Sequence, residues 1–280
     1  MRLPLLIALT MTAFAANSVL NRAAVGPGLI DATAFGTVRL WSGALCLAAL
    51  CLMLRGTVRL GGPGRVAGVL GLLLYIYGFS AAYVALDAGL GALILFGTVQ
   101  VTMFAGSLAG GERPPALRWI GAALAFAGLV WLLWPKGAGS VSLLHGAAML
   151  VAGLGWGLYS LAGRKATDPL AATAANFLIA APLGLLLAQG LPVAPDAVPS
   201  TAAGLALAVA SGALTSGLGY ALWYHLLPQV TGTAAAVAQL TVPVIAMAGG
   251  MLALSEPLTG QFVVASVVVL GGVALSLLKR

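Results

Sequence analysis

The chain has 280 residues, of which 61% are hydrophobic and only 7% are charged, and its formal net charge is +7. A soluble domain of this size needs more charged side chains than this to keep its surface hydrated. The composition therefore excludes a water-soluble globular protein and indicates a chain embedded in lipid. Glycine accounts for 38 residues, roughly twice its ordinary share, and between membrane helices it permits close backbone contact.

Apolar windows of about twenty residues, the length that crosses a bilayer as a helix, occur ten times along the chain. They predict an all-α integral membrane protein with helices over residues 3–21, 32–54, 66–86, 89–109, 116–134, 142–163, 170–189, 201–226, 230–253 and 259–278. The connections are short and rich in glycine and proline, and none is long enough for a soluble domain. The first segment also resembles a cleavable signal peptide, but the repeat described next favours a retained helix.

The second five segments repeat the first five. Residues 1–136 align with residues 140–280 so that Ser18 matches Ser160, Arg22 matches Arg164 and Pro27 matches Pro169 at a separation of 142, while Glu112 matches Glu256 and Gly128 matches Gly272 at a separation of 144. Because five is odd, the second copy must cross the bilayer in the opposite direction. The sequence therefore predicts two inverted five-helix repeats, an arrangement in which solute carriers hold substrate near the membrane midplane.

Basic residues fall mostly in the connections on one side of the predicted membrane. Ten lie on the side that holds both termini, namely Arg2, Arg55, Arg59, Arg65, Arg113, Arg118, Arg164, Lys165, Lys279 and Arg280, whereas Arg22 and Lys136 lie on the other. Cytoplasmic connections carry such an excess, so both termini are predicted to be cytoplasmic. The basic residues form no continuous face, and a nucleic-acid partner is not expected. Arg39 is the one basic residue in the interior of a predicted span, since Arg118 lies at the start of the fifth.

The residues for several kinds of chemistry are missing. The sequence has no Walker-type loop, and neither His145 and His225 nor Cys46 and Cys51 have the spacing of a metal site, so no cofactor, metal or enzyme activity is expected. The six acidic residues all fall at predicted span ends or in connections, which offers no midplane proton relay. Two of them, Glu112 and Glu256, are expected to begin the following helices, where the helix dipole favours negative charge.

Polar and aromatic side chains inside the spans are the candidates for contact with a solute. Members at a spacing of four share one helix face, as Tyr75 and Phe79 do. The candidate substrate-binding residues are Asn17, Tyr75, Phe79, Phe96, Gln100, Trp156, Tyr159, Ser160, Tyr220 and Gln239. A buried amide is costly in hydrocarbon, so Gln100 and Gln239 are the strongest candidates for a polar cavity, with a bond between two helices as the alternative.

Pro243 lies four residues after Gln239 and cannot donate a backbone hydrogen bond to its carbonyl. This predicts a kink in the ninth span, serving either as a gating hinge or as a static bend. Three further aromatic residues, Tyr83, Trp134 and Tyr224, lie near predicted span ends and are expected in the aromatic belt at the membrane interface.

Several short motifs resemble the drug/metabolite transporter superfamily, in its EamA branch of bacterial exporters. They are Trp156-Gly157 with the basic pair Arg164-Lys165, Pro243, Leu254-Ser255-Glu256-Pro257-Leu258, Gly271-Gly272-Val273, Gly110-Gly111-Glu112-Arg113-Pro114 and Gly128-Leu129-Val130. The resemblance covers essentially the whole chain. It departs from the pattern in the first span, where Ala15-Ala16 stands in place of Trp-Gly, and in the fourth, where no proline corresponds to Pro243.

The resemblance implies a carrier of the bacterial inner membrane that alternates between inward and outward openings and exports small amphipathic metabolites. The aromatic candidates make it similar to aromatic amino-acid exporters, and the absence of a midplane carboxylate favours a uniporter. Expected partners are the lipid bilayer and a small-molecule substrate, with the protein a monomer or weak homodimer. The alternatives are a proton-coupled exporter, a nucleotide-sugar carrier, against which the single intramembrane cation argues, and a non-transporting membrane enzyme or assembly factor.

Overall fold

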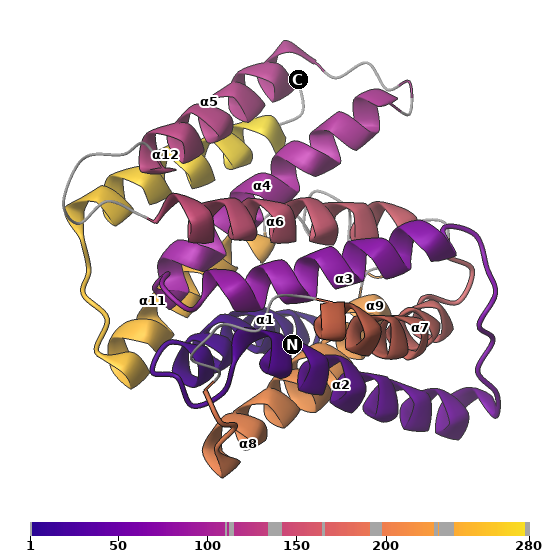
Figure 1. Ribbon diagram of the computed structural model, residues 1–280. Helices are drawn as coiled ribbons and strands as arrows, with labels where there is room; N and C mark the ends of the chain where they lie inside the picture. The colour runs from indigo at the N-terminus through magenta and orange to yellow at the C-terminus, as the bar shows by residue number, and fades with distance from the viewer. Residues whose placement is uncertain are drawn as a thin grey trace.

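The computed structural model describes residues 2–109, 111, 115–133, 142–163, 166–190, 198–226, 229 and 238–277, and the regular elements within these ranges are helices (Figure 1). In chain order they are α1 (Arg2–Val25), α2 (Ala32–Arg55), α3 (Arg65–Ala82), α4 (Ala88–Ala109), α5 (Ala116–Leu133), α6 (Leu143–Gly163), α7 (Pro169–Gly190), α8 (Ala202–Ala210), the π-helix η1 (Ser211–Leu218), α9 (Gly219–Leu226), α11 (Thr241–Leu254) and α12 (Gly260–Leu277).

The prediction of an all-helical membrane protein is confirmed. Among the described residues, seven helical segments are long and apolar enough to cross a membrane, one of them formed by α8, η1 and the start of α9 in unbroken succession. The segments in α5, α11 and α12 are apolar but shorter. Each described helix or run of helices falls on one of the ten predicted ranges, although α11 begins at Thr241 and residues 230–237 lie outside the described part.

Local sequence signals explain where several helices begin and end. The Asp31 carboxylate accepts hydrogen bonds from the backbone N–H groups of Thr33 and Ala34 and so caps the start of α2. Gly56 ends the same helix in the left-handed conformation, with φ of 70°, which a residue without a side chain adopts at little cost. The Thr201 hydroxyl accepts from the N–H of Gly204 and caps α8.

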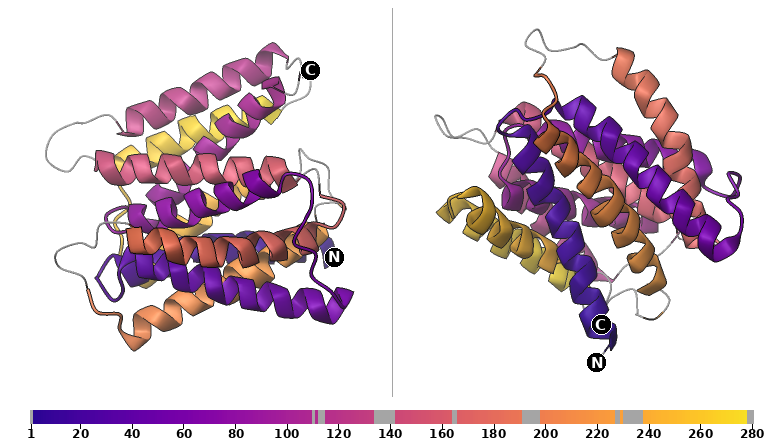
Figure 2. Two further views of the ribbon diagram at one scale, coloured as in Figure 1. Left: turned by 45° about the vertical axis from the view of Figure 1, so that its right-hand side comes forward. Right: turned by 90° about the horizontal axis from the view of Figure 1, so that it is seen from below.

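The helices pack in a pattern that places α1, α3, α4 and α6 at the centre. Helix α3 lies along α6, α2 along α7, α4 against α6 and α11, and α1 against α11 and the α8–α9 run. In Figure 1, α5 and α12 lie side by side at the top, and α4 runs from them into the middle of the molecule. Figure 2 shows the beginning of α1 and the end of α12 toward the same end of the bundle.

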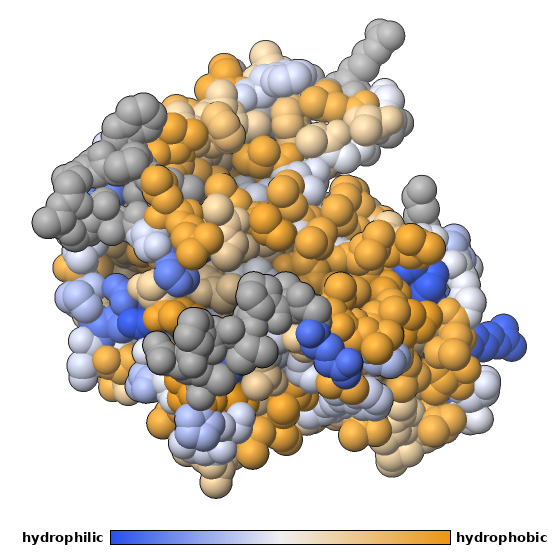
Figure 3. All heavy atoms as spheres, viewed as in Figure 1, coloured by the Kyte–Doolittle hydropathy of each residue, from blue (hydrophilic) through white to orange (hydrophobic). Residues whose placement is uncertain are grey.

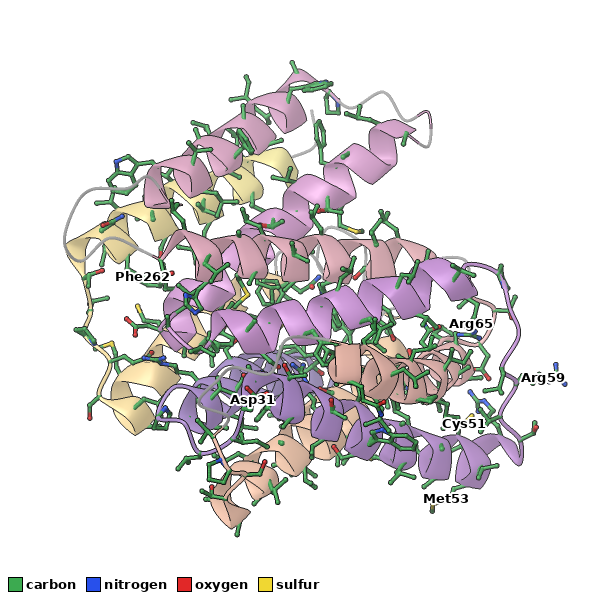
Figure 4. All side chains as sticks on the ribbon, viewed as in Figure 1. Asp31, Cys51, Met53, Arg59, Arg65 and Phe262 are labelled. Atoms are coloured by element: carbon green, nitrogen blue, oxygen red, sulfur yellow. The ribbon has the colours of Figure 1, made fainter. Side chains whose placement is uncertain are left out.

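The surface is apolar and part of the interior is polar, the reverse of a soluble protein. Met53 and Leu252 are 82% and 88% exposed, and apolar side chains cover much of the face in Figure 3. In Figure 4, Met53 points away from α2 into the surroundings, while Arg59 and Arg65 lie at the end of the bundle that holds the α2–α3 connection. By contrast, Asn17 and Arg39 are buried. This distribution suits a lipid solvent.

Two expectations about residues at helix ends were wrong. Glu256 does not begin α12, which starts at Gly260; its carboxylate accepts hydrogen bonds from the Ala88 N–H and therefore caps α4. Tyr83 is fully buried rather than in an interfacial belt, and its hydroxyl donates to the Ala88 carbonyl. Both side chains bond to the backbone of Ala88 at the start of α4. For Glu256 this contact exists only once the helices have packed together. The predictions for Glu112, Trp134 and the Tyr224 side chain lie outside what is described.

Candidate substrate cavity

A narrow cavity with an empty volume of about 270 Å³ lies where the central helices meet. Its walls come from α1, α3, α4, α6 and α9, and the lining residues are Phe14, Asn17, Ser18, Tyr75, Phe79, Leu95, Phe96, Trp156 and Tyr220. This volume includes space open to the surroundings, and the enclosed room is about that of one water molecule, so the cavity is nearly closed in this conformation. The composition is unusual for a membrane interior because aromatic rings and hydrogen-bonding groups face the same space.

Trp156 stands at the centre of the aromatic wall. Its ring centroid lies 4.9 Å from that of Tyr75 and 4.9 Å from that of Tyr220, with Phe14 edge-on at 6.1 Å. Phe79 continues the wall beside Tyr75 at 5.2 Å. Edge-to-face and tilted contacts of this kind hold rings in defined orientations, so the wall is a preformed apolar surface of planar side chains.

A hydrogen-bond network joins α1 to the π-helix on the polar side. The side-chain oxygen of Asn17 accepts hydrogen bonds from the hydroxyls of Ser211, Thr215 and Ser216. The wider turn of a π-helix places these three hydroxyls on one face, and such segments recur at functional sites. Three donors on one amide oxygen fix which way the amide points, and none of these hydrogen bonds uses its nitrogen.

Arg39 of α2 lies directly behind this wall and is fully buried. Its Nε donates to the Ser216 hydroxyl at 3.0 Å and its Nη2 donates to the Tyr75 hydroxyl at 2.8 Å. The guanidinium carbon also lies 5.0 Å and 4.9 Å from the ring centroids of Tyr75 and Phe79, within the range of cation–π attraction. A permanent positive charge is thus held against the polar end of the cavity.

Two glycine contacts bring these helices close enough to form the site. A Cβ added to Gly155 of α6 would lie 2.5 Å from the Gly71 carbonyl oxygen and 2.6 Å from the Tyr75 nitrogen of α3. A Cβ added to Gly212 of η1 would overlap the Ser42 hydroxyl and the Arg39 carbonyl oxygen of α2. The first contact sets Trp156 beside Tyr75, and the second sets Ser216 beside Arg39.

Six of the ten candidate residues line the cavity, namely Asn17, Tyr75, Phe79, Phe96, Trp156 and Tyr220. Tyr159 is buried behind Trp156, stacked on it at 5.5 Å, and its hydroxyl donates to Thr173. The Ser160 hydroxyl donates to the Trp156 carbonyl within its own helix. Gln100 and Gln239 are half-buried and do not line the cavity.

Pro243 is buried at the third position of α11. A proline in the first turn removes no intrahelical hydrogen bond, because the first N–H groups of a helix have no partner within it. Pro243 therefore does not have to bend α11, and a kink in the middle of the ninth span does not follow from its position. A hinge role for Pro243 stays a prediction.

Sequence reasoning missed Arg39 as a member of the site, and also Phe14 and Leu95. Arg39 carried a readable signal, because an ionisable residue inside a span marks a functional position by default. Phe14 and Leu95 carried no comparable signal, since apolar residues fill most positions of every span. Their place in the cavity lining depends on the rotation of α1 and α4 about their axes.

A second polar cluster lies at the end of the bundle where α3 and α11 end. Arg22 pairs with Glu256 at 3.4 Å and lies 3.8 Å from Asp87, and it donates to the carbonyls of Tyr83 and Val84. Burial raises the pKa of the Glu256 carboxyl above its ordinary value, while the Ala88 N–H and the Arg22 charge offset part of this effect. The cluster ties α1 to the α3–α4 and α11–α12 connections.

Comparison with known proteins places the chain in a family. The model of the EamA-like transporter family matches residues 145–278. An uncharacterized protein of Pseudomonas aeruginosa is 48% identical over 276 residues, which cover 99% of this chain and 94% of that one. The chain belongs to the EamA-like transporter family. It is accordingly a multi-pass membrane transporter, as the resemblance of the motifs implies.

A more distant relative and a solved structure are similar to this chain over most of its length. An uncharacterized transporter of Archaeoglobus fulgidus is 24% identical over 220 residues, 76% of each chain. A crystal structure of a protein matches with a TM-score of 0.65 over 97% of this chain and 95% of that one. At 19% identity, this second likeness concerns the fold alone.

Proposed function

We propose that this EamA-like transporter exports small amphipathic metabolites, including aromatic amino acids, across the bacterial inner membrane as a uniporter. The observation that carries the proposal is the cavity between α1, α3, α4, α6 and α9, where an aromatic wall faces hydrogen-bonding groups. A metabolite with a ring and a polar head matches both surfaces. The protein acts on its own as a carrier rather than as an enzyme.

Alternating access in this proposal rests on two inverted repeats, residues 1–136 and 140–280. The largest helix contacts support that pairing, because they have counterparts when α1–α5 are exchanged with α6, α7, the α8–α9 run, α11 and α12, whereas the smaller contacts of α4 with α1, α5 and α12 have none of similar extent. The contact of α3 with α6 corresponds to that of the α8–α9 run with α1, and the contact of α4 with α6 to that of α11 with α1. Rocking of one half against the other would open the cavity to either side.

The positions of the acidic groups favour uniport. The described carboxylates, those of Asp31, Asp87, Asp168 and Glu256, lie at helix ends or in connections rather than inside a span. A proton-coupled exporter is the second candidate, because the half-buried Glu256 carboxyl has a raised pKa and pairs across three parts of the chain. The two candidates differ in whether a pH gradient drives accumulation.

Flux in proteoliposomes tests the proposal. Vesicles loaded with labelled phenylalanine should release it faster than protein-free vesicles, without an imposed proton gradient. Trp156→Leu should slow this release, whereas Trp41→Leu, at a lipid-facing position of α2 that is 39% exposed, should leave it unchanged. Accumulation against the phenylalanine gradient driven by pH alone would reject uniport, and equal release from loaded vesicles with and without protein would reject amino-acid export.

A further inference from the structure

We propose that Tyr75 and Asn17, backed by the positive charge of Arg39, form a receptor for a carboxylate, so that the substrate is a monocarboxylate with an aromatic or apolar body. An α-ammonium group is not part of what the site recognises. This inference rests on the proposed function and names the chemical class of its substrate. Four observations on the described residues carry it: a buried cation without a counter-ion among them, a guanidinium nitrogen that none of them pairs, two donors without an acceptor among them, and the apolar wall beside these groups.

Arg39 has no counter-ion among the described residues. Each described acidic residue is engaged elsewhere: Asp31 caps α2, Asp87 and Glu256 face Arg22, and Asp168 pairs with Arg55. A charge inside a membrane protein is costly and is ordinarily paired. A fully buried guanidinium that meets only hydroxyls and ring faces therefore calls for an anion that arrives with the ligand.

The guanidinium is buried behind the cavity lining, and its hydrogen bonds leave one nitrogen without a partner among the described residues. Nε and Nη2 are taken by Ser216 and Tyr75, but buried Nη1 has no partner among the described residues. A buried donor without an acceptor carries a desolvation cost that a ligand oxygen would remove. The Arg39 charge lies one hydrogen bond behind Tyr75, so it attracts an anion held at the Tyr75 hydroxyl across a region that little water screens.

Tyr75 and Asn17 supply neutral donors next to that charge. The Tyr75 hydroxyl accepts from Arg39 and from the Tyr220 hydroxyl at 3.3 Å, so its own proton remains to be donated. The Asn17 oxygen accepts from three hydroxyls, so its N–H groups remain. Both residues line the cavity. The site thus offers hydrogen-bond donors and a positive charge, and no carboxylate is among the described residues that line it. Such a site favours binding of an anion over binding of an ammonium group.

The rest of the cavity selects the body of the ligand. The lining beyond Asn17 and Ser18 is aromatic or aliphatic, and it includes Trp156 and Phe96. An inorganic anion would make no apolar contact with the aromatic wall. A ligand with two negative charges would find no second cation among the described residues near the cavity. The combination therefore specifies one carboxylate attached to an apolar group.

Three probes that share a phenylpropyl skeleton separate the contributions. Binding of 3-phenylpropionate, 3-phenylpropanamide and 3-phenylpropylamine to purified full-length protein in detergent is measured by calorimetry, with phosphate as an inorganic competitor. We expect the acid to bind at least tenfold more tightly than the amide or the amine. Arg39→Gln should remove most of that preference. Arg59→Gln, which deletes the same charge from an exposed connection, should keep it.

Two further measurements keep the test decisive. If Arg39→Gln does not fold, Tyr75→Phe removes only the hydroxyl and should still weaken acid binding more than amide binding. Equal affinity of the wild-type protein for acid and amide, a preference retained in a folded Arg39→Gln protein, or phosphate competing as well as the acid would each overturn the proposal. Flux of the same acid in proteoliposomes separates the two hypotheses: binding that depends on Arg39 without flux rejects the carrier function and retains the receptor.

Discussion

At the residue scale, Arg39 shows how a membrane interior treats a charge. The side chain cannot reach water, so three hydroxyl and ring partners from other helices hold it instead, one of them Ser216, 177 positions away in the chain. Its neighbour Tyr75 is held in turn by Arg39 and Tyr220. Each of these residues is polar enough to have been noticed in the sequence, but their mutual contact is a property of the packed bundle.

Asp168 provides a test of a local contact with a known sign. Burial raises the pKa of the Asp168 carboxyl, but hydrogen bonds from Arg55 and the Ala171 N–H lower it by more. The pKa therefore lies below its ordinary value. Its stabilising contribution is therefore present at neutral pH and is lost as the pH falls through the folded-state pKa. Asp168→Ala should cost roughly 1 kcal/mol at pH 7, because it loses the cap of α7 and an exposed ion pair.

Thermal unfolding in detergent at pH 7 and pH 3 measures this effect. Asp168→Asn keeps a capping side chain and loses only the charge, so it should be milder than Asp168→Ala. The difference between wild type and Asp168→Asn should shrink at pH 3. A difference that is the same at both pH values would show that the Arg55 pair does not stabilise the folded state.

At the element scale, adjacent glycines of α12 separate packing from helix propensity. A Cβ on Gly272 would lie 2.7 Å from the Ala125 nitrogen and 2.8 Å from the Gly121 carbonyl of α5, whereas a Cβ on Gly271 meets nothing within 4 Å. Gly272→Ala should therefore destabilise the protein by roughly 1–3 kcal/mol through forced separation of two helices. Gly271→Ala should be neutral or slightly stabilising, because alanine has the higher helix propensity.

The thermal unfolding midpoints of the two variants in detergent test whether α5 and α12 are in backbone contact. The expected order is Gly272→Ala below wild type, with Gly271→Ala at or above it. Equal midpoints for both variants would mean that α5 and α12 are not in backbone contact. The same reasoning applies to Gly155, whose contact with α3 sets the aromatic wall.

At the scale of the whole molecule, the positive-inside asymmetry and the arrangement of the helices predict the orientation. Gly61 lies in the α2–α3 connection and Leu258 in the α11–α12 connection, and both are exposed. In a background lacking Cys46 and Cys51, Gly61→Cys should react with a membrane-impermeant reagent only from the cytoplasmic side, and Leu258→Cys only from the opposite side. Labelling of both from one side would reject the topology.

Charge on the substrate predicts a response to membrane potential. A monocarboxylate carries one negative charge, and moving it across a potential involves about 2.3 kcal/mol per 100 mV, whereas a zwitterionic amino acid carries no net charge. Efflux of 3-phenylpropionate should therefore accelerate when the vesicle interior is made negative, after subtraction of leakage from protein-free vesicles. Phenylalanine efflux should not respond. Equal potential dependence for both solutes would contradict uniport of the anion.

The sequence by itself determined that this is a helical protein in lipid, where its spans lie, and which family its motifs belong to. These properties depend on composition, on the length that crosses a bilayer and on short local motifs, so they can be read one segment at a time. The same logic identified Asn17, Tyr75, Phe79, Phe96, Trp156 and Tyr220 as unusual for a span interior.

Only the tertiary structure decided which of these residues meet. Gln100, Ser160 and Gln239 are as polar as Asn17, but their helices turn them to other surroundings, and Glu256 and Tyr83 found partners at the start of α4. In an apolar chain nearly every helix face is compatible with lipid, so hydropathy does not fix the rotation of a helix. The rotation is fixed by glycine contacts such as Gly155 with Gly71 and by the need of buried polar groups such as Arg39 for partners from other helices.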